Sequence, residues 1–210
     1  MVTAGATKAH LDDVRYLSNY STGELGFLLC KKLKSLGVEV IAVTGPSQFD
    51  FAPLKLHKHF KVETPEEMRR ATLSAARKYK PEWGVFAAAV LDFVPKRTLK
   101  GKVSSKNSWK ITLVPTRKII EDVSRVAPKM KKIGFKLESK RLSGGRLKSF
   151  AAKKMTDQNL SGLCVNFFSD ISARAHAAAC FDRVGNVSRL RAKWEIVRWI
   201  ARQIVTDGPR

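Results

Sequence analysis

The segment VRYLSNYSTGELG, residues 14–26, precedes an amphipathic run at residues 27–36 and has the composition of a loop that enters a helix. Ser21 or Thr22 is expected to cap this helix by accepting from its first N–H groups. The two glycines of the tail let the backbone come close to a ligand or to a neighbouring strand. Such a helix start, with free donors and a positive dipole end, suits phosphate binding; the alternative is an ordinary strand–loop–helix joint.

Length and composition indicate one α/β domain spanning residues 1–210, with 44% apolar residues and a full hydrophobic core. No segment reaches the roughly 20 apolar residues needed to cross a bilayer, and no signal peptide is visible, so no membrane association is expected. Three scattered cysteines without CxxC spacing indicate reduced thiols, a cytoplasmic setting and no zinc site. These are Cys30, Cys164 and Cys180.

The net charge of +22 is unevenly distributed. Residues 1–95 hold 13 basic and 10 acidic residues, a net +3, whereas residues 96–210 hold 27 basic and 8 acidic residues, a net +19. This charge favours anionic partners such as nucleotides, phosphorylated metabolites or nucleic acid. A solvated basic surface without a specific partner is the alternative.

Strand-like and helix-like segments alternate along the chain, which predicts an α/β, Rossmann-like three-layer fold with a mostly parallel sheet. Strands are expected at residues 2–4, 38–43, 60–62, 83–90, 111–114, 132–138 and 162–166. Helices are expected at residues 27–36, 64–78, 117–126, 150–155 and 194–205. Gly185-Asn186 predicts a hairpin between residues 180–182 and 187–190. The basic residues 96–115 are expected to form a small projecting β arm, and residues 139–146 a mobile loop.

Five motifs occur in an order that identifies a family. They are VTAGATKAHLDDVRYLSNYSTGELG at residues 2–26, VTGP at 43–46, AAAVLDFVP at 87–95, GKVSSK followed by ITLVPTRKII within 101–120, and IGFKLES with LCVNFFSDIS within 133–172. Together they resemble phosphopantothenoylcysteine synthetase (phosphopantothenate–cysteine ligase), the ligase half of the coenzyme A biosynthesis (DNA/pantothenate metabolism) flavoprotein family. The resemblance covers residues 1–205.

The resemblance implies a ligase that joins 4'-phosphopantothenate to cysteine. CTP, with ATP as the alternative, together with Mg²⁺, would activate the carboxylate as an acyl-nucleotidylate with loss of pyrophosphate. The cysteine amine would then displace the nucleoside monophosphate. Family members are commonly homodimers, and residues 96–115 are where exchange between subunits is expected.

The resemblance also implies the site residues. Asn19 matches the asparagine that contacts the activated carboxylate, and Lys102 matches the catalytic lysine whose charge favours the transition state. Arg15 suits a charge-assisted contact with substrate; a surface ion pair is the alternative. The nucleotide-binding residues implied are Ser21, Thr22, Gly23, Ala88, Ala89, Asp92, Lys102 and Phe135. No metal ligand can be named, and Lys118, Lys153 and Lys154 match only loosely.

The sequence departs from the family pattern at several positions. Glu24 stands where the phosphate loop often has a lysine, and Leu91 and Phe93 replace the alanine and tyrosine of an ADY segment. Ala6 replaces a glycine of the opening turn. The flavin-binding decarboxylase half is absent from the sequence, so no flavin is expected.

A Rossmann-like module that binds nucleic acid through its basic half is the alternative function. Trp83, Trp109, Trp194 and Trp199 could stack on bases, but no nucleic-acid signature is present. A nicotinamide-dependent dehydrogenase is excluded, because the GxGxxG spacing after the first strand is missing. His57 and His59 are expected to be surface residues rather than metal ligands.

Overall fold

Parallel strands form the centre of the protein in the computed structural model, which describes residues 1–171 and 176–206. The strands that run parallel are β1 (Val2–Ala4), β4 (Ile41–Thr44), β5 (Lys58–Lys61), β6 (Trp83–Phe86), β9 (Lys131–Glu138) and β10 (Gly162–Ile171). An antiparallel hairpin of β11 (His176–Phe181) and β12 (Val187–Leu190) extends the sheet, whose order is β12-β11-β10-β9-β6-β1-β4-β5. The expected Rossmann-like α/β fold is confirmed.

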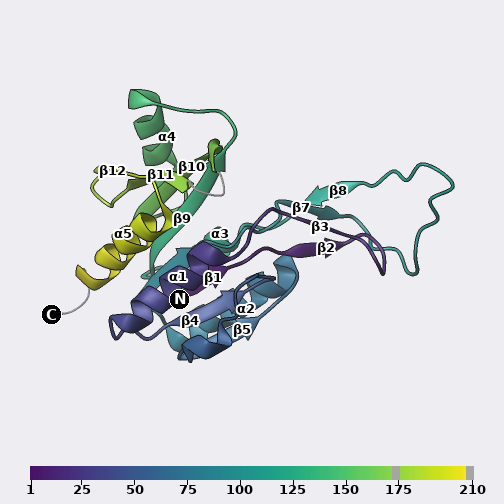
Figure 1. The fold of residues 1–210 in the computed structure, drawn as a ribbon, viewed down its shortest axis with the longest axis horizontal. Helices are drawn as coiled ribbons and strands as arrows, with labels where there is room; N and C mark the ends of the chain where they lie inside the picture. Colours follow the sequence, from purple (N-terminus) through teal and green to yellow (C-terminus); the bar gives the residue numbers. More distant parts are fainter. Residues whose placement is uncertain (172–175, 207–210) are drawn as a thin grey trace.

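Helices cover both faces of this sheet because successive strand residues point to opposite sides (Figure 1). On one face lie α1 (Glu24–Ser35) and α5 (Lys193–Thr206), which pack against each other through Leu29 and Ile200 among other core residues. On the other face lie α2 (Pro65–Tyr79), α3 (Ile119–Val126) and α4 (Gly144–Asp157). A short 3-10 turn, η1 (Ala52–Leu54), packs beside α1 on the first face.

A long arm projects from the body, as Figure 1 shows on its right-hand side. It contains two antiparallel ribbons, one of β2 (Lys8–His10) with β3 (Tyr16–Ser18) and one of β7 (Phe93–Pro95) with β8 (Leu113–Pro115). The backbone N–H of Leu99 donates to the carbonyl of Leu11 at 3.0 Å, which joins the two halves. The arm therefore includes the first part of the segment at residues 14–26, called the signature segment below, as well as residues 96–115.

Element boundaries differ from the sequence expectations where loops begin. The strand expected at 83–90 ends at Phe86, and the alanines that follow continue beside the opening turn, where Ala89 forms a single parallel bridge with Ala6. The expected strand at 111–114 is β8 of the arm. Helix α4 begins at Gly144, so it takes up part of the expected loop and extends the helix expected at 150–155 in both directions. Thr64 caps α2 in a capping box with Glu67, as the sequence predicts.

Two of the three cysteines are neighbours in space, although they are far apart in the chain. Cys164 of β10 and Cys180 of β11 are directly opposite, and their Sγ atoms are 2.8 Å apart. All three cysteines are buried free thiols. Their spacing in the chain did not indicate this contact, because it depends on the antiparallel pairing of β10 with β11.

Gly45 allows the loops after β1 and β4 to cross. A Cβ atom at this position would lie 1.7 Å from the carbonyl oxygen of Ala6. We expect Gly45→Ala to destabilise the fold by about 3 kcal/mol or more, because backbone must move to admit the methyl group. Chemical denaturation measures the change.

Gly145→Ala is the matched control, since a Cβ there meets no atom within 4 Å. This variant should be neutral or more stable by up to about 1 kcal/mol, because alanine favours the helix. Equal stability of the two variants would contradict the close crossing.

Candidate functional site

The loops that follow β1, β4 and β6 meet at the carboxyl edge of the sheet, where ligands of open α/β folds bind. Backbone hydrogen bonds hold these loops together. The N–H of Ala6 donates to the carbonyl of Pro46 at 3.0 Å, and the N–H of Ala89 donates to Gly5 at 2.8 Å. The predicted nucleotide-contacting residues Ala88 and Ala89 therefore lie beside the opening turn, despite its alanine at position 6.

The amino terminus of α1 points to the same edge. Its N-cap is Gly23, with a left-handed φ of 79° and no side-chain cap, so neither Ser21 nor Thr22 is the N-cap residue; the expected capping is met only by Thr22, which accepts from the N–H of Glu24. Their hydroxyls accept from the N–H groups of Gly23 and Glu24, each at 3.3 Å. A Cβ at Gly23 would lie 2.3 Å from the Oγ of Ser47, which explains the need for glycine.

This arrangement leaves backbone donors at the start of α1. In the described part of the chain, no acceptor is found for the N–H groups of Leu25 and Gly26. Free donors at the positive end of a helix dipole favour an anion such as a phosphate. Ser21, Thr22 and Gly23 thus form the loop that would surround such a group.

Glu24 is paired with a lysine from a distant element. Its carboxylate accepts a hydrogen bond from the Nζ of Lys193, the first residue of α5. His176 lies close to both: burial lowers its pKa, with a smaller lowering by Lys193 and an opposing effect of Glu24. The carboxylate at position 24 is thus neutralised by a lysine from another helix. Sequence reasoning missed Lys193 and His176, because nothing in the sequence links them to residue 24.

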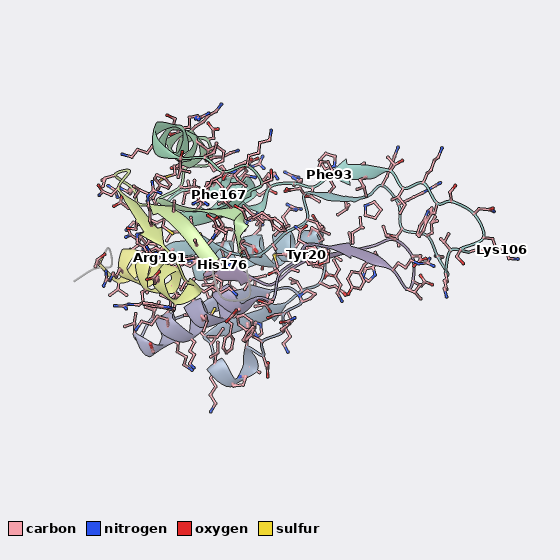
Figure 2. All side chains as sticks on the ribbon, turned by 45° about the horizontal axis from the view of Figure 1, so that its top comes forward. Tyr20, Phe93, Lys106, Phe167, His176 and Arg191 are labelled. Atoms are coloured by element: carbon pink, nitrogen blue, oxygen red, sulfur yellow. The ribbon has the colours of Figure 1, made fainter. Side chains whose placement is uncertain are left out.

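Asn19 lies at the base of the arm and contacts the stretch after β6. Its side-chain amide donates to the carbonyl of Val90 at 3.1 Å. The hydroxyl of Thr7, which is fully buried, accepts from the N–H of Leu91 at 3.0 Å. Figure 2 shows the neighbouring Tyr20 at the same junction of arm and body. The signature asparagine and the predicted nucleotide-contacting stretch are therefore adjacent.

Asp92 and Lys118 form an exposed ion pair at this edge, with Nζ and Oδ1 2.5 Å apart. Thr116 supports the pair, since its N–H donates to the carbonyl of Asp92 at 2.9 Å and its hydroxyl to Leu91 at 2.7 Å. Lys118 therefore contacts a predicted nucleotide-binding residue. Phe135, on β9, lies half-buried opposite Cys164 and packs against the core under α1 and α5.

Arg15 and Lys102 lie at the far end of the arm rather than at the carboxyl edge. Arg15 donates to the buried Asp12 at 2.6 Å and lies over the ring of Trp109. Asp12 also accepts from the N–H of Val103, which fixes the segment that carries Lys102. Burial favours a raised pKa for Asp12, but the backbone donors and the guanidinium outweigh it and lower the pKa.

The length of β3 separates the predicted residues at the far end of the arm, Arg15 and Lys102, from Asn19 at its base. Arg15 and Asn19 flank the strand at opposite ends, so their Cα atoms are about 13 Å apart at the rise of an extended chain. Figure 2 shows the arm running from Tyr20 at the body to Lys106 at its tip. Within one chain, the structure does not bring Arg15 and Lys102 to Asn19 and the start of α1.

Residues 1–171 and 176–206 contain no group of three His, Cys, Asp or Glu side chains that could hold a metal ion. The expectation that His57 and His59 are surface residues holds only in part, because His59 is half-buried and bonds to the hydroxyl of Thr44 at 2.8 Å. In the same ranges, no helix is long and apolar enough to cross a membrane. Ser172, the last residue of the motif LCVNFFSDIS, lies outside the described residues.

The fold and the loops at its carboxyl edge are those of a Rossmann-like α/β domain, with free backbone donors at the start of α1. The family model described as "DNA/pantothenate metabolism flavoprotein C-terminal domain" matches residues 1–206. The chain therefore belongs to the DNA/pantothenate metabolism flavoprotein C-terminal domain family.

Relatives support this assignment. The chain is 36% identical over 165 residues to the coenzyme A biosynthesis bifunctional protein CoaBC of Thermococcus kodakarensis, covering 79% of this chain and 40% of that protein. It is 30% identical to a cysteine/cysteine sulfinic acid decarboxylase of an unknown prokaryotic organism, covering 98% and 57%. The chain thus spans about half the length of these relatives.

Solved structures share the fold. The DNA/pantothenate metabolism flavoprotein from Streptococcus pneumoniae superposes with a TM-score of 0.85 at 23% identity, covering 99% of this chain and 98% of that one. The C-terminal domain of coenzyme A biosynthesis bifunctional protein CoaBC superposes with a TM-score of 0.76 at 25% identity, covering 98% and 94%.

The Glu24–Lys193 pair predicts an effect on triphosphate binding. Lys193→Gln should weaken the binding of CTP or ATP about tenfold, because a cation beside the start of α1 is lost. Calorimetric titration measures the affinity. Arg198→Gln, which removes the same charge from the same helix, is the control and should keep wild-type affinity. Equal losses in the two variants would refute a specific role for Lys193.

Proposed function

We propose that this protein is a ligase that joins 4'-phosphopantothenate and cysteine in coenzyme A biosynthesis. The observation that supports this proposal most directly is the contact of Asn19 with Val90. This contact brings the signature segment to residues 87–95, the stretch predicted to contact the nucleotide. Membership of the family and the names of the CoaBC relatives support the assignment. A related fold, Cab2 with the H337A substitution, is described as a complex with phosphopantothenate-cysteine.

The first step of the proposed reaction activates a carboxylate. An oxygen of the 4'-phosphopantothenate carboxylate attacks the α-phosphorus of the nucleotide, and the bond to pyrophosphate breaks. The donors at the start of α1 and the ammonium of Lys193 would hold phosphate oxygens. Lys102 would stabilise the charge that develops on the leaving pyrophosphate. The amide of Asn19 would hydrogen-bond the carboxylate without competing as a nucleophile.

The second step forms the amide bond. The cysteine amine attacks the acyl carbon of the acyl-nucleotidylate, loses a proton, and releases the nucleoside monophosphate. Ala88 and Ala89 have small side chains beside the opening turn, so they would let the nucleotide approach the backbone. Asp92 and Phe135 complete the proposed nucleotide site, and Arg15 a contact with the substrate phosphate or carboxylate.

CTP rather than ATP is the proposed nucleotide, accompanied by Mg²⁺. Magnesium is commonly held by one or two carboxylates and the phosphates of its substrate, and Asp92 is an exposed carboxylate at this edge. Bound to the triphosphate, the ion would neutralise charge on the phosphates. No flavin is proposed. The buried free thiols suit a cytoplasmic enzyme.

A homodimer with exchanged arms would complete the site. Lys102 and Arg15 lie at the tip of the arm, a strand's length from Asn19 in the same chain. Exposed apolar side chains on the arm, including Tyr16, Phe93 and Leu113, suit burial against a second copy. The arm of one subunit would thus supply Lys102 to the carboxyl edge of its partner.

Pyrophosphate release tests the proposed activity. Wild-type protein with 4'-phosphopantothenate, Mg²⁺ and CTP should release pyrophosphate, and cysteine should be required for release of the monophosphate. Lys102→Gln should lower the rate by about 100-fold or more, because the stabilising charge is lost. Asn19→Asp should also impair activity. Lys106→Gln, on the same segment, is the control; folded wild-type protein without activity would refute the ligase.

Subunit mixing tests the exchanged arms. Lys102→Gln and Asn19→Asp dimers are each inactive, but a mixed dimer with exchanged arms contains one intact site. Refolding an equal mixture should therefore restore about a quarter of wild-type activity, since half the dimers are mixed and carry one good site of two. If both residues act within one subunit, the mixture remains as inactive as its parents.

A further inference from the structure

The proposed ligase accounts for little of the positive charge of this chain. Residues 96–210 carry a net charge of +19, whereas a triphosphate site needs only a few cations. Within residues 183–202 there are six basic residues and one acidic residue, Glu195. These residues form β12 and most of α5, so the charge lies on a defined part of the fold.

An arginine–tryptophan stripe runs along the outer side of α5. Its members follow one another at spacings of three, four and four residues, which places them on one side of a helix. They are Arg191, just before the helix, and Trp194, Arg198 and Arg202. All four side chains are exposed, and Trp194 is 55% exposed. The opposite side of the helix, which includes Ile196 and Ile200, is buried in the core.

The stripe has no neutralising carboxylates. Among residues 1–171 and 176–206, no Asp or Glu side chain forms an ion pair with Arg191, Arg198 or Arg202. The carboxylate of Glu195 accepts from the backbone N–H groups of Arg191 and Ala192, at 2.6 and 3.2 Å. The guanidinium of Arg198 lies 5.4 Å from the centre of the Trp194 ring. The stripe therefore presents three arginines and an exposed indole.

We propose that this stripe binds single-stranded nucleic acid. Guanidinium groups match phosphates bidentately, and successive arginines four residues apart rise about 6 Å along the helix, which suits contacts with an extended phosphate backbone. An exposed indole beside them can stack on an unpaired base. Duplexes conceal their base faces, so a single strand uses both features of the stripe.

The surface is separate from the proposed ligase site. Lys193 turns toward Glu24 at the start of α1, whereas the stripe continues along α5 away from that point. Figure 2 shows Arg191 on the body, on the side opposite to the arm tip at Lys106. A nucleotide at the carboxyl edge should therefore not compete with a strand on α5.

Fluorescence anisotropy with a labelled oligouridylate tests the proposal on the whole protein. Wild type should bind, and saturating CTP should not displace the strand. The triple variant R191A/R198A/R202A should lose affinity at least tenfold. The slope of the logarithm of its binding constant against the logarithm of salt concentration should become shallower by about two, since three phosphate contacts disappear. Trp194→Ala should lose about tenfold with an unchanged slope, because stacking is uncharged.

The control variant R70A/R77A/K78A removes the same charge from α2, on the opposite face of the sheet. It should keep most of the affinity. An equal loss in both triple variants would overturn the proposal in favour of diffuse attraction by net charge. Absence of oligouridylate binding, displacement by CTP, or preference for phosphatidylserine vesicles or polyglutamate would also overturn it. Circular dichroism verifies that each variant is folded.

Discussion

The carboxyl edge of the sheet depends on the close crossing of two loops. The N–H of Gly45 donates to the carbonyl of Ala4 at 3.0 Å, and Ala6 donates to Pro46 at 3.0 Å. Only glycine fits at position 45, because a side chain would overlap the Ala6 carbonyl. The crossing sets the path of the opening turn, which in turn bonds to the stretch after β6. Backbone contacts therefore hold the predicted nucleotide-contacting alanines beside the opening turn, and the side chains of Asn19 and Thr7 join the base of the arm to the same stretch.

Charge is arranged differently on the body and on the arm. At the carboxyl edge, two lysines have carboxylate partners: Lys193 pairs with Glu24, and Lys118 pairs with Asp92. Such pairs hold the lysine ammonium in position and neutralise its charge. At the arm tip, Asp12 plays the same part for Arg15 while fixing the backbone beside Lys102. Among residues 1–171 and 176–206, no carboxylate pairs with the arginines on the outer side of α5, which distinguishes that side from the proposed ligase site.

The departures from the family pattern acquire physical meaning in the structure. The negative charge of Glu24 is neutralised by Lys193, which lies 169 residues later in the chain. Ala6 is accommodated because its N–H, not its side chain, makes the contact between loops. Phe93 has lost a hydroxyl but remains exposed at the root of the arm, where an apolar ring suits burial against a second subunit. The fold therefore accommodates these three substitutions.

The sequence alone determined the fold class, because alternating apolar strands and capped amphipathic helices leave few arrangements other than a covered parallel sheet. It also determined the family, since the motifs occur in order along the whole chain. Local patterns predicted Thr64 as a helix cap and the hairpin at Gly185-Asn186, where the contacts are short-range. Long-range contacts were decided only by the tertiary structure. The pairing of Glu24 with Lys193, the adjacency of Cys164 and Cys180, and the separation of Lys102 from Asn19 depend on how distant segments pack, which no local pattern records.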